Sequence, residues 1–246
     1  MIEQKAFIKN LEIYYKVIGE GEKTLLILHG WGSKSANWHK TAELISKKKV
    51  KVIIPDLPGF GKSNKPPYVW NFDEYCTFLK EFTDYLKIDR FCLLGHSFGG
   101  ALAIKFSFKF PQKIIKLFLV SAACIRKKTL KKKALFIVSK IFKIFSFVPM
   151  IKKAFYKFIV KSDYPATKGF MRKTYLNIIR EDLTPIFEHI KVPTTIIWGE
   201  KDNVTPLKQA ELIKSKIKNS KLIIIPQGTH DLERQMPEEL VKNITC

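Results

Sequence analysis

Short apolar runs recur along the chain, and segments with a helical period separate them. Continuous apolar runs of this kind are typical of strands that are buried on both faces of a parallel sheet. The runs lie at residues 24–28, 50–54, 91–94, 115–120, 194–198 and 222–225. Residues 11–17 have the composition of one further strand, and residues 38–48 and 73–87 have helical patterns. Strands that alternate with helices predict an α/β fold, a mostly parallel sheet with helices on both faces.

A long stretch without strand-like runs separates residues 115–120 from residues 194–198. Residues 130–148 are apolar except for a narrow stripe of lysines and serines, and Pro149 follows them. Residues 150–161 place apolar side chains on one helical face and lysines on the other. Because lysines interrupt both segments, neither is the run of about 20 apolar residues that spans a membrane.

The helical stretch divides the chain into a core and an insertion, which we call the cap. We expect residues 1–121 and 192–246 to form the core and residues 122–191 to form the cap. A chain of 246 residues has room for one α/β domain with such an insertion. Thr184-Pro185 is typical of a helix start, and it predicts a short helix that leads back to the core.

Positive charge gathers in the same stretch. The formal net charge is +22, and residues 126–173 contain 15 lysines and arginines against one acid, Asp163. One explanation is a lysine-rich composition that places lysine on any solvated face. The other is attraction to an acidic protein or an anionic membrane surface, which clustered positive charge favours. No nucleic-acid-binding motif accompanies the charge, so we do not expect a nucleic-acid partner.

The cysteines and the N-terminus indicate a reducing compartment. The four cysteines show no C-x-x-C or metal-like spacing, so we expect reduced core thiols and neither a metal nor a cofactor. No apolar run follows a basic start in residues 1–5, so neither a signal peptide nor a membrane anchor is visible. A cytoplasmic location is the resulting expectation.

The pentapeptide at residues 95–99 reads G-x-S-x-G and follows the apolar run at residues 91–94. A serine at the tip of a sharp strand-to-helix turn requires small residues two positions before and after it, because strand and helix approach closely there. Gly95 and Gly99 meet this requirement. The motif therefore predicts that Ser97 is a nucleophile.

A serine hydroxyl is a weak nucleophile, so it needs a general base and a carboxylate that orients that base. Asp202 and His230 each follow an apolar run, as Ser97 does. The carboxyl ends of parallel strands meet at one edge of an open sheet, which is where ligands bind. The chain order of nucleophile, acid and histidine is the one associated with the G-x-S-x-G turn. We therefore predict a triad of Ser97, His230 and Asp202.

Other acids and histidines compete for these roles. We favour Asp202 over Glu200, because Asp202 stands at the bend before a helix that starts with Thr205-Pro206. Asp231 adjoins the histidine and is interpreted as a polar loop residue. Surface or structural roles are expected for the other histidines, namely His29, His39, His96 and His189.

Acyl transfer also needs N–H donors directed at the oxyanion that forms in the tetrahedral intermediate. One predicted donor is the backbone N–H of Phe98, at the start of the helix after the nucleophile. The second is the backbone N–H of Trp31, in the sharp turn after residues 24–28. This turn lacks the G-x-x-x-x-G-K-[ST] pattern of a phosphate-binding loop.

Five motifs follow one another in a specific order. They are His29-Gly30-Trp31-Gly32, Asp56 to Ser63, Gly95 to Gly100, Gly199 to Asp202 with Pro206, and Gly228-Thr229-His230. In this order they resemble the α/β-hydrolase superfamily, and the resemblance covers the chain apart from the cap. It implies an eight-stranded sheet, the Ser97–His230–Asp202 triad, an oxyanion hole at Trp31 and Phe98, and a helical cap. The segment Asp56 to Ser63 is interpreted as a structural loop.

The resemblance narrows the range of possible substrate classes but does not identify the substrate. Ser97 argues against the haloalkane dehalogenases and epoxide hydrolases of this fold, which use an aspartate nucleophile, and the H-G-G-P-G motif of proline iminopeptidases is absent. We expect hydrolysis of a carboxylic ester or thioester with an apolar acyl group. The core motifs resemble carrier-protein methyl ester esterases, whose acidic carrier would suit a basic cap. Two alternatives remain open: a carbon–carbon bond hydrolase of the same fold, and a module that binds membranes or acidic proteins through the cap.

Overall fold

The computed structural model describes residues 1–126 and 169–246. An eight-stranded sheet with the strand order β1-β2-β4-β3-β5-β6-β7-β8 forms its centre. The strands are β1 (Ile2–Ile8), β2 (Leu11–Ile18), β3 (Lys23–Leu28), β4 (Val50–Pro55), β5 (Phe91–His96), β6 (Ile114–Val120), β7 (Thr194–Gly199) and β8 (Ser220–Ile225). Strands β4, β3, β5, β6, β7 and β8 are mutually parallel, and β2 pairs antiparallel with both β1 and β4.

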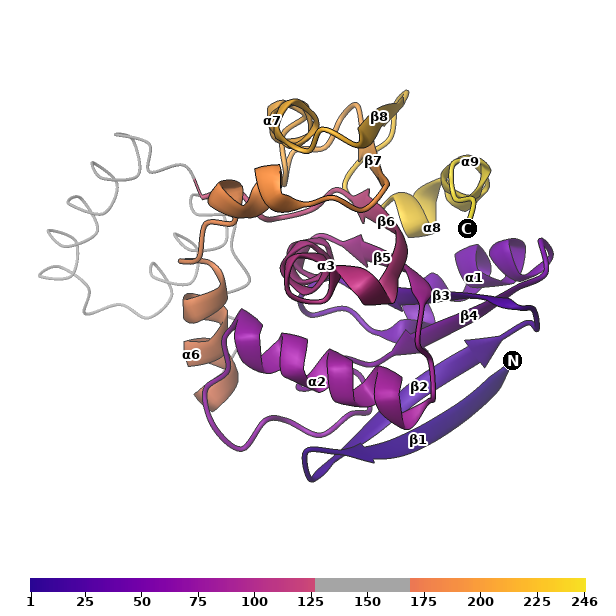
Figure 1. Cartoon of the computed structure of the whole chain (residues 1–246), viewed down its shortest axis with the longest axis vertical. Helices are drawn as coiled ribbons and strands as arrows, with labels where there is room; N and C mark the ends of the chain where they lie inside the picture. The colour runs from indigo at the N-terminus through magenta and orange to yellow at the C-terminus, as the bar shows by residue number, and fades with distance from the viewer. Residues whose placement is uncertain (127–168) are drawn as a thin grey trace, which may run out of the picture.

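Helices cover both faces of the sheet. The α-helices are α1 (His39–Ser46), α2 (Phe72–Tyr85), α3 (Phe98–Lys109), α6 (Gly169–Ile178), α7 (Lys208–Lys216), α8 (Leu232–Gln235) and α9 (Pro237–Lys242). The 3-10 helices are η1 (Ser35–Trp38), η2 (Pro111–Lys113) and η5 (Thr184–His189). Helices α2, α3 and α7 pack on one face, and α1, α8 and α9 pack on the other (Figure 1). The predicted eight-stranded α/β architecture is confirmed.

The apolar runs of the central strands contribute side chains to two hydrophobic cores, one on each face of the sheet. Leu26 and Leu28 of β3 belong to the core beneath α2 and α3, whereas Leu25 and Ile27 belong to the core beneath α1 and α9. Successive side chains of a strand point to opposite faces, so a strand covered on both sides must be apolar throughout. This is why the central strands were visible in the sequence as unbroken apolar runs.

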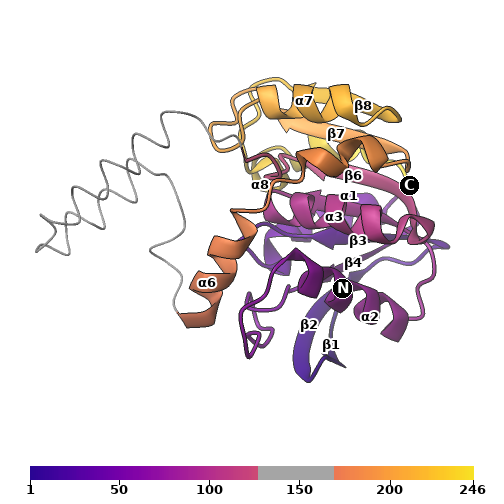
Figure 2. The same ribbon diagram turned by 60° about the vertical axis from the view of Figure 1, so that its left-hand side comes forward.

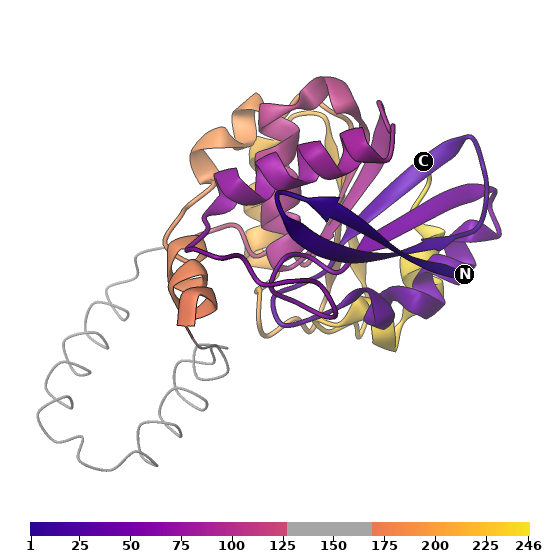
Figure 3. The same ribbon diagram turned by 90° about the horizontal axis from the view of Figure 1, so that it is seen from below.

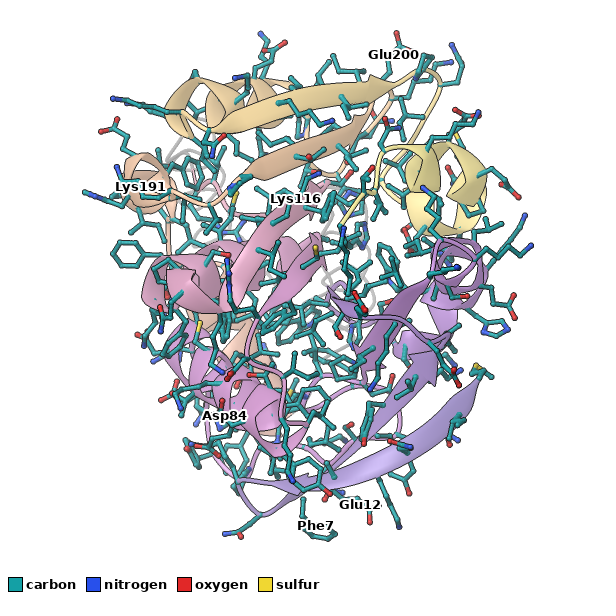
Figure 4. All side chains as sticks on the ribbon, turned by 45° about the vertical axis from the view of Figure 1, so that its right-hand side comes forward. Phe7, Glu12, Asp84, Lys116, Lys191 and Glu200 are labelled. Carbon is teal, nitrogen blue, oxygen red and sulfur yellow. The ribbon has the colours of Figure 1, made fainter. Side chains whose placement is uncertain are left out.

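Strand β1 has no such signal and is absent from the strands that the apolar pattern predicts. It pairs only with β2, at the edge of the sheet (Figure 3). Most of its side chains are exposed. Phe7 and Glu12 are register partners on these two strands, and both side chains lie at the outer edge of the molecule (Figure 4). An edge strand with little burial needs no apolar alternation.

Helix α2 begins at a capping box. The Asn71 side chain accepts hydrogen bonds from the backbone N–H groups of Asp73 (2.6 Å) and Glu74 (3.4 Å), and the Glu74 carboxylate accepts one from the Asn71 N–H (2.7 Å). Reciprocal bonds of this kind satisfy N–H groups that have no partner inside the helix. They fix the start of the helix that covers the sheet beside α3.

Two local predictions need adjustment. The helix expected to start with Thr205-Pro206 begins at Lys208, because Thr205 is held by hydrogen bonds to Asp202 and Trp198. The short helix expected at Thr184-Pro185 is present, as the 3-10 helix η5.

The cap prediction lies largely outside the described residues, because these omit residues 127–168. Of the predicted cap, the structure describes residues 122–126 and 169–191, which include α6 and η5. Helix α6 lies beside the start of α2 (Figure 2), where the Trp70 N–H donates to the Thr174 hydroxyl at 2.9 Å. Among residues 1–126 and 169–246, no helix has the length and apolar content that crossing a membrane requires.

Candidate active site

Ser97 occupies the sharp turn between β5 and α3 in a strained backbone conformation. Its φ of 52° and ψ of −114° lie in a region that costs a non-glycine residue about 1–3 kcal/mol. Hydrogen bonds hold it there: the Ser97 N–H donates to the Val120 carbonyl at 3.0 Å. The Ser97 carbonyl accepts the N–H groups of Gly100, Ala101 and Ala123 at 2.9–3.1 Å. The surrounding backbone therefore imposes this geometry on the serine.

The glycines on either side of the serine are required by close approach. A Cβ on Gly95 would collide with the Gly99 carbonyl, and a Cβ on Gly99 would collide with the Leu28 carbonyl. Strand β5, the first turn of α3 and the end of β3 meet at this point. Only glycine allows the three backbones to come this close.

Asp202 and His230 are brought together at the ends of β7 and β8. The His230 Nδ1 lies 2.9 Å from the Asp202 Oδ2 and donates to that carboxylate. The Asp202 Oδ1 accepts the N–H groups of Val204 and Thr205, each at 2.8 Å, and the Thr205 hydroxyl donates to Oδ2 at 2.8 Å. With Nδ1 protonated, the His230 Nε2 is left as the lone-pair nitrogen that a general base needs.

The same hydrogen bonds keep Asp202 ionised. Burial opposes its charge, but the bonds from His230 and Thr205 outweigh burial and lower the pKa of Asp202 to about 2. A carboxylate that stays charged can stabilise an imidazolium on His230 during proton transfer.

The competing acids have other partners. The Glu200 carboxylate accepts the N–H of Gln227 at 3.0 Å, and the Asp231 carboxylate forms an ion pair of 2.6 Å with Arg234. Neither carboxylate contacts a His230 ring nitrogen in the described part of the chain.

Ser97 and His230 lie at the same end of the sheet, but no hydrogen bond joins the Ser97 hydroxyl to the His230 ring among the described residues. The ring of His96, the residue before Ser97, lies 4.9 Å from the His230 ring between centroids. Bonds between a nucleophile and its base are commonly long until substrate binds.

The loop after β3 brings Trp31 beside the serine. A Cβ built on Gly30 would lie 3.4 Å from the Ser97 Cβ, and the Ser33 N–H donates to the Gly30 carbonyl at 3.1 Å, which closes the turn around Trp31. His29 braces this loop, since its Nδ1 donates to the Gly30 carbonyl (2.8 Å) and its Nε2 accepts the Leu57 N–H (3.0 Å).

Phe98 is the first residue of α3, so its N–H has no acceptor inside the helix. Helix starts present such N–H groups to anions. Phe98 directly follows Ser97, and the loop that carries Trp31 approaches Ser97 at Gly30, so the backbone N–H groups of Trp31 and Phe98 remain the predicted oxyanion donors.

Aromatic rings gather at the same place, although the motifs predicted only backbone roles for Trp31 and Phe98. The Trp31 ring contacts the rings of Phe60, Phe98 and Tyr175 at centroid distances of 4.8, 5.3 and 5.1 Å. Tyr175 comes from α6, so this cluster connects the core to the described part of the predicted cap. Phe60 lies within the motif from Asp56 to Ser63, and this position was the one sign in the sequence that it could lie near the site.

The motif from Asp56 to Ser63 is a structural loop, as interpreted. The Asp56 carboxylate accepts the N–H groups of Ser35 (2.6 Å) and Lys62 (2.9 Å), and the Ser63 hydroxyl donates to the Asp56 carbonyl (2.6 Å). These bonds join the loop after β4 to the start of η1.

His96 has a structural position, but it lies against the candidate site. It is 4 % exposed, and its Nε2 lies 2.9 Å from the His230 carbonyl oxygen. His96, Asp231 and Glu233 also place potential metal-ligand atoms within 4.8 Å of one another. Since the His96 Nε2 donates to the His230 carbonyl, that nitrogen is not available to a cation. Nothing in the sequence indicated that His96 and Glu233 would meet.

The comparisons with known proteins concern the fold family of the chain. A family model described as the α/β-hydrolase fold matches residues 23–149. The chain is 28% identical over 246 residues to a pimeloyl-[acyl-carrier protein] methyl ester esterase from Wigglesworthia glossinidia brevipalpis, covering 88% of this chain and 90% of that protein.

One further match covers only part of each chain, and another shows similarity of fold. An uncharacterised Mycobacterium tuberculosis protein is 35% identical over 113 residues, which cover 46% of this chain and a third (33%) of that protein's length. The crystal structure of a membrane phospholipase A, a bacterial virulence factor, has a TM-score of 0.77 at 24% identity and covers 98% of this chain and 83% of that one. With more than half of its residues matched by the family model, the chain belongs to the α/β-hydrolase fold family.

Proposed function

We propose that this protein is a serine hydrolase that cleaves a carboxylic ester or thioester with an apolar acyl group. The observation that carries the proposal is the 2.9 Å hydrogen bond between Asp202 and His230, at the same end of the sheet as the strained Ser97. A buried carboxylate, an oriented histidine and a serine on a sharp turn are the parts that nucleophilic acyl transfer needs.

In the proposed reaction the Ser97 Oγ attacks the acyl carbon and gives its proton to the His230 Nε2. The backbone N–H groups of Trp31 and Phe98 donate to the oxyanion. The intermediate collapses when His230 returns the proton to the departing alcohol or thiol, which leaves an acyl-enzyme on Ser97. A water molecule then attacks the acyl carbon by the same steps and releases the carboxylic acid.

The aromatic cluster supports an apolar acyl group. Trp31 and Phe98, whose N–H groups are the proposed oxyanion donors, also place their rings against Phe60 and Tyr175. An acyl carbonyl bound to those N–H groups would have aromatic carbon beside it, and apolar pockets with few polar groups bind such chains.

A carrier-protein substrate is the partner that we favour. The match with the esterase relative covers 88% of this chain, and the name of that relative states that it acts on the methyl ester of a pimeloyl-[acyl-carrier protein]. The basic residues 126–173 would attract an acidic carrier. The predicted cap, at residues 122–191, would be the surface where the carrier binds.

The test compares the protein with its Ser97→Ala variant on p-nitrophenyl esters of graded chain length, matched thioesters and a carrier-protein-linked methyl ester. Loss of the nucleophile should lower kcat by about 10³-fold or more. Ser215→Ala is the matched control, because this serine is exposed on α7. A Ser97→Ala variant with full activity would exclude the mechanism. Cleavage of a vinylogous diketone, with no ester or thioester hydrolysed, would favour the carbon–carbon alternative.

A further inference from the structure

His96 contacts the loop that carries the candidate base. This residue ends β5 and immediately precedes Ser97, while His230 lies 134 positions later, after β8. The His96 Nε2 and the His230 carbonyl oxygen are 2.9 Å apart. A carbonyl oxygen only accepts hydrogen bonds, so the His96 Nε2 carries the proton and donates it to this bond.

Burial keeps the His96 ring in this single role. The residue is 4 % exposed, and its ring centroid is 4.9 Å from that of His230 and 6.0 Å from that of Trp38. Its Nδ1 is buried and has no hydrogen-bond partner within residues 1–126 and 169–246. Burial and the neighbouring His230 lower the pKa of His96 to about 4, so the ring is neutral at pH 7 with its one proton on Nε2.

The loop between β8 and α8 has other anchors on both sides of His230. The Gln227 N–H donates to the Glu200 carboxylate at 3.0 Å, and the Asp231 carbonyl accepts the N–H groups of Arg234 and Gln235, each at 3.1 Å. The Gly228 carbonyl accepts the Lys201 N–H at 2.8 Å, and Asp202 holds the His230 side chain through Nδ1. The side chain is thus oriented from the β7 side, whereas the backbone of His230 itself is held from the β5 side, by His96.

We propose that His96 is a positioning residue: its Nε2–H holds the backbone of His230 at a fixed distance from Ser97, to which His96 is covalently attached. This inference rests on the proposed function of Ser97 and His230. It assigns to the variable position of the G-x-S-x-G motif a role beyond that of spacer. A displacement of about 1 Å between nucleophile and base can cost about 100-fold in rate, so one backbone hydrogen bond can matter at this place.

Two amide variants separate the hydrogen bond from mere polarity. The amide nitrogen of Gln reaches the place of the imidazole Nε2, whereas that of Asn reaches only the place of Nδ1. His96→Gln therefore keeps a donor for the His230 carbonyl, and His96→Asn removes it. His96→Phe removes the donor but keeps a ring of similar shape beside Trp38 and His230.

The measurement is kcat per active serine, obtained by titrating each variant with a fluorophosphonate, so that unfolded molecules are not counted. We expect kcat to fall about 10- to 100-fold in His96→Asn and His96→Phe while KM stays nearly constant. His96→Gln should keep most of the kcat of the parent protein. His189→Phe is the matched control, since His189 is exposed on η5.

Each outcome decides one question. Equal kcat in His96→Gln and His96→Asn, or wild-type kcat in His96→Phe, would overturn the positioning role. A rise in KM at unchanged kcat would overturn it as well, because it indicates a binding defect. If the Ser97→Ala variant in the same assay stayed active, or the parent protein neither reacted with the fluorophosphonate nor cleaved any ester, the proposed function would have failed instead.

Discussion

Glu233 offers a quantitative test of how burial acts on charge in this protein. The residue is 2 % exposed, and its Oε2 has no hydrogen-bond partner among the described residues. Burial, with a smaller contribution from Asp231, raises the pKa of Glu233 from its ordinary value of 4.5 to about 7. The variant that removes this ionisation with little change of shape is Glu233→Gln.

The magnitude follows from the difference between the folded and unfolded chains. Below pH 4.5 both states hold the proton, so Glu233 adds no dependence on pH. Between pH 4.5 and about 7 the unfolded chain releases the proton while the folded protein keeps it, so stability falls as the pH rises. At about 1.36 kcal/mol per pH unit, the loss reaches about 3 kcal/mol above pH 7.

A neutral glutamine does not incur this loss. We expect Glu233→Gln to match the parent protein at pH 4 and to exceed its free energy of unfolding by about 3 kcal/mol at pH 8. The assay is urea unfolding followed by tryptophan fluorescence at pH steps from 4 to 8. Glu22→Gln is the control, because Glu22 is exposed. A stability difference that does not change with pH, or a less stable variant at pH 8, would refute this reasoning.

Two further variants test the candidate site and the fold. Asp202→Asn should lower kcat by about 10⁴-fold, because an amide facing the His230 Nδ1 selects the wrong tautomer. An activity within tenfold of the parent protein would contradict the triad, and Asp89→Asn on the surface is the control. Asn71→Ala should lower the free energy of unfolding by about 1 kcal/mol, because it removes the cap of α2. Chemical denaturation measures this loss, and a change no larger than that of exposed Asn219→Ala would contradict it.

The sequence was sufficient where burial forces a pattern. Strands β3 and β5 are covered on both faces, so their apolar runs predicted them directly. The turn at Ser97 was predictable because its geometry excludes side chains at Gly95 and Gly99. Asp202 and His230 could be paired in advance because parallel strands deliver their C-terminal residues to one edge.

The features that the sequence did not predict depend on contacts between distant segments, which no local pattern records. Strand β1 pairs with one strand and buries only Ala6 and Ile8, so its apolar residues form no unbroken run. The contact of His96 with the His230 carbonyl joins residues 134 positions apart, and it depends on the exact course of the loop after β8. Glu233 lies in a polar segment that is typical of the solvated start of a helix. Its burial becomes visible only in the packing of α8 against the sheet.

Residues of the candidate site come from two distant parts of the chain, and this has a consequence for the order in which the protein is synthesised. Ser97 and its turn belong to β5 and α3, and they can form once β6 has emerged from the ribosome. Asp202 and His230 arrive only with β7 and β8, after residues 121–193 have been made. A nascent chain would therefore carry the serine without its base and would expose β6 as an unpaired edge, a form prone to aggregation until β7 docks. If the proposed function holds, activity should appear only after β8 and the loop that carries His230 have been made and have docked.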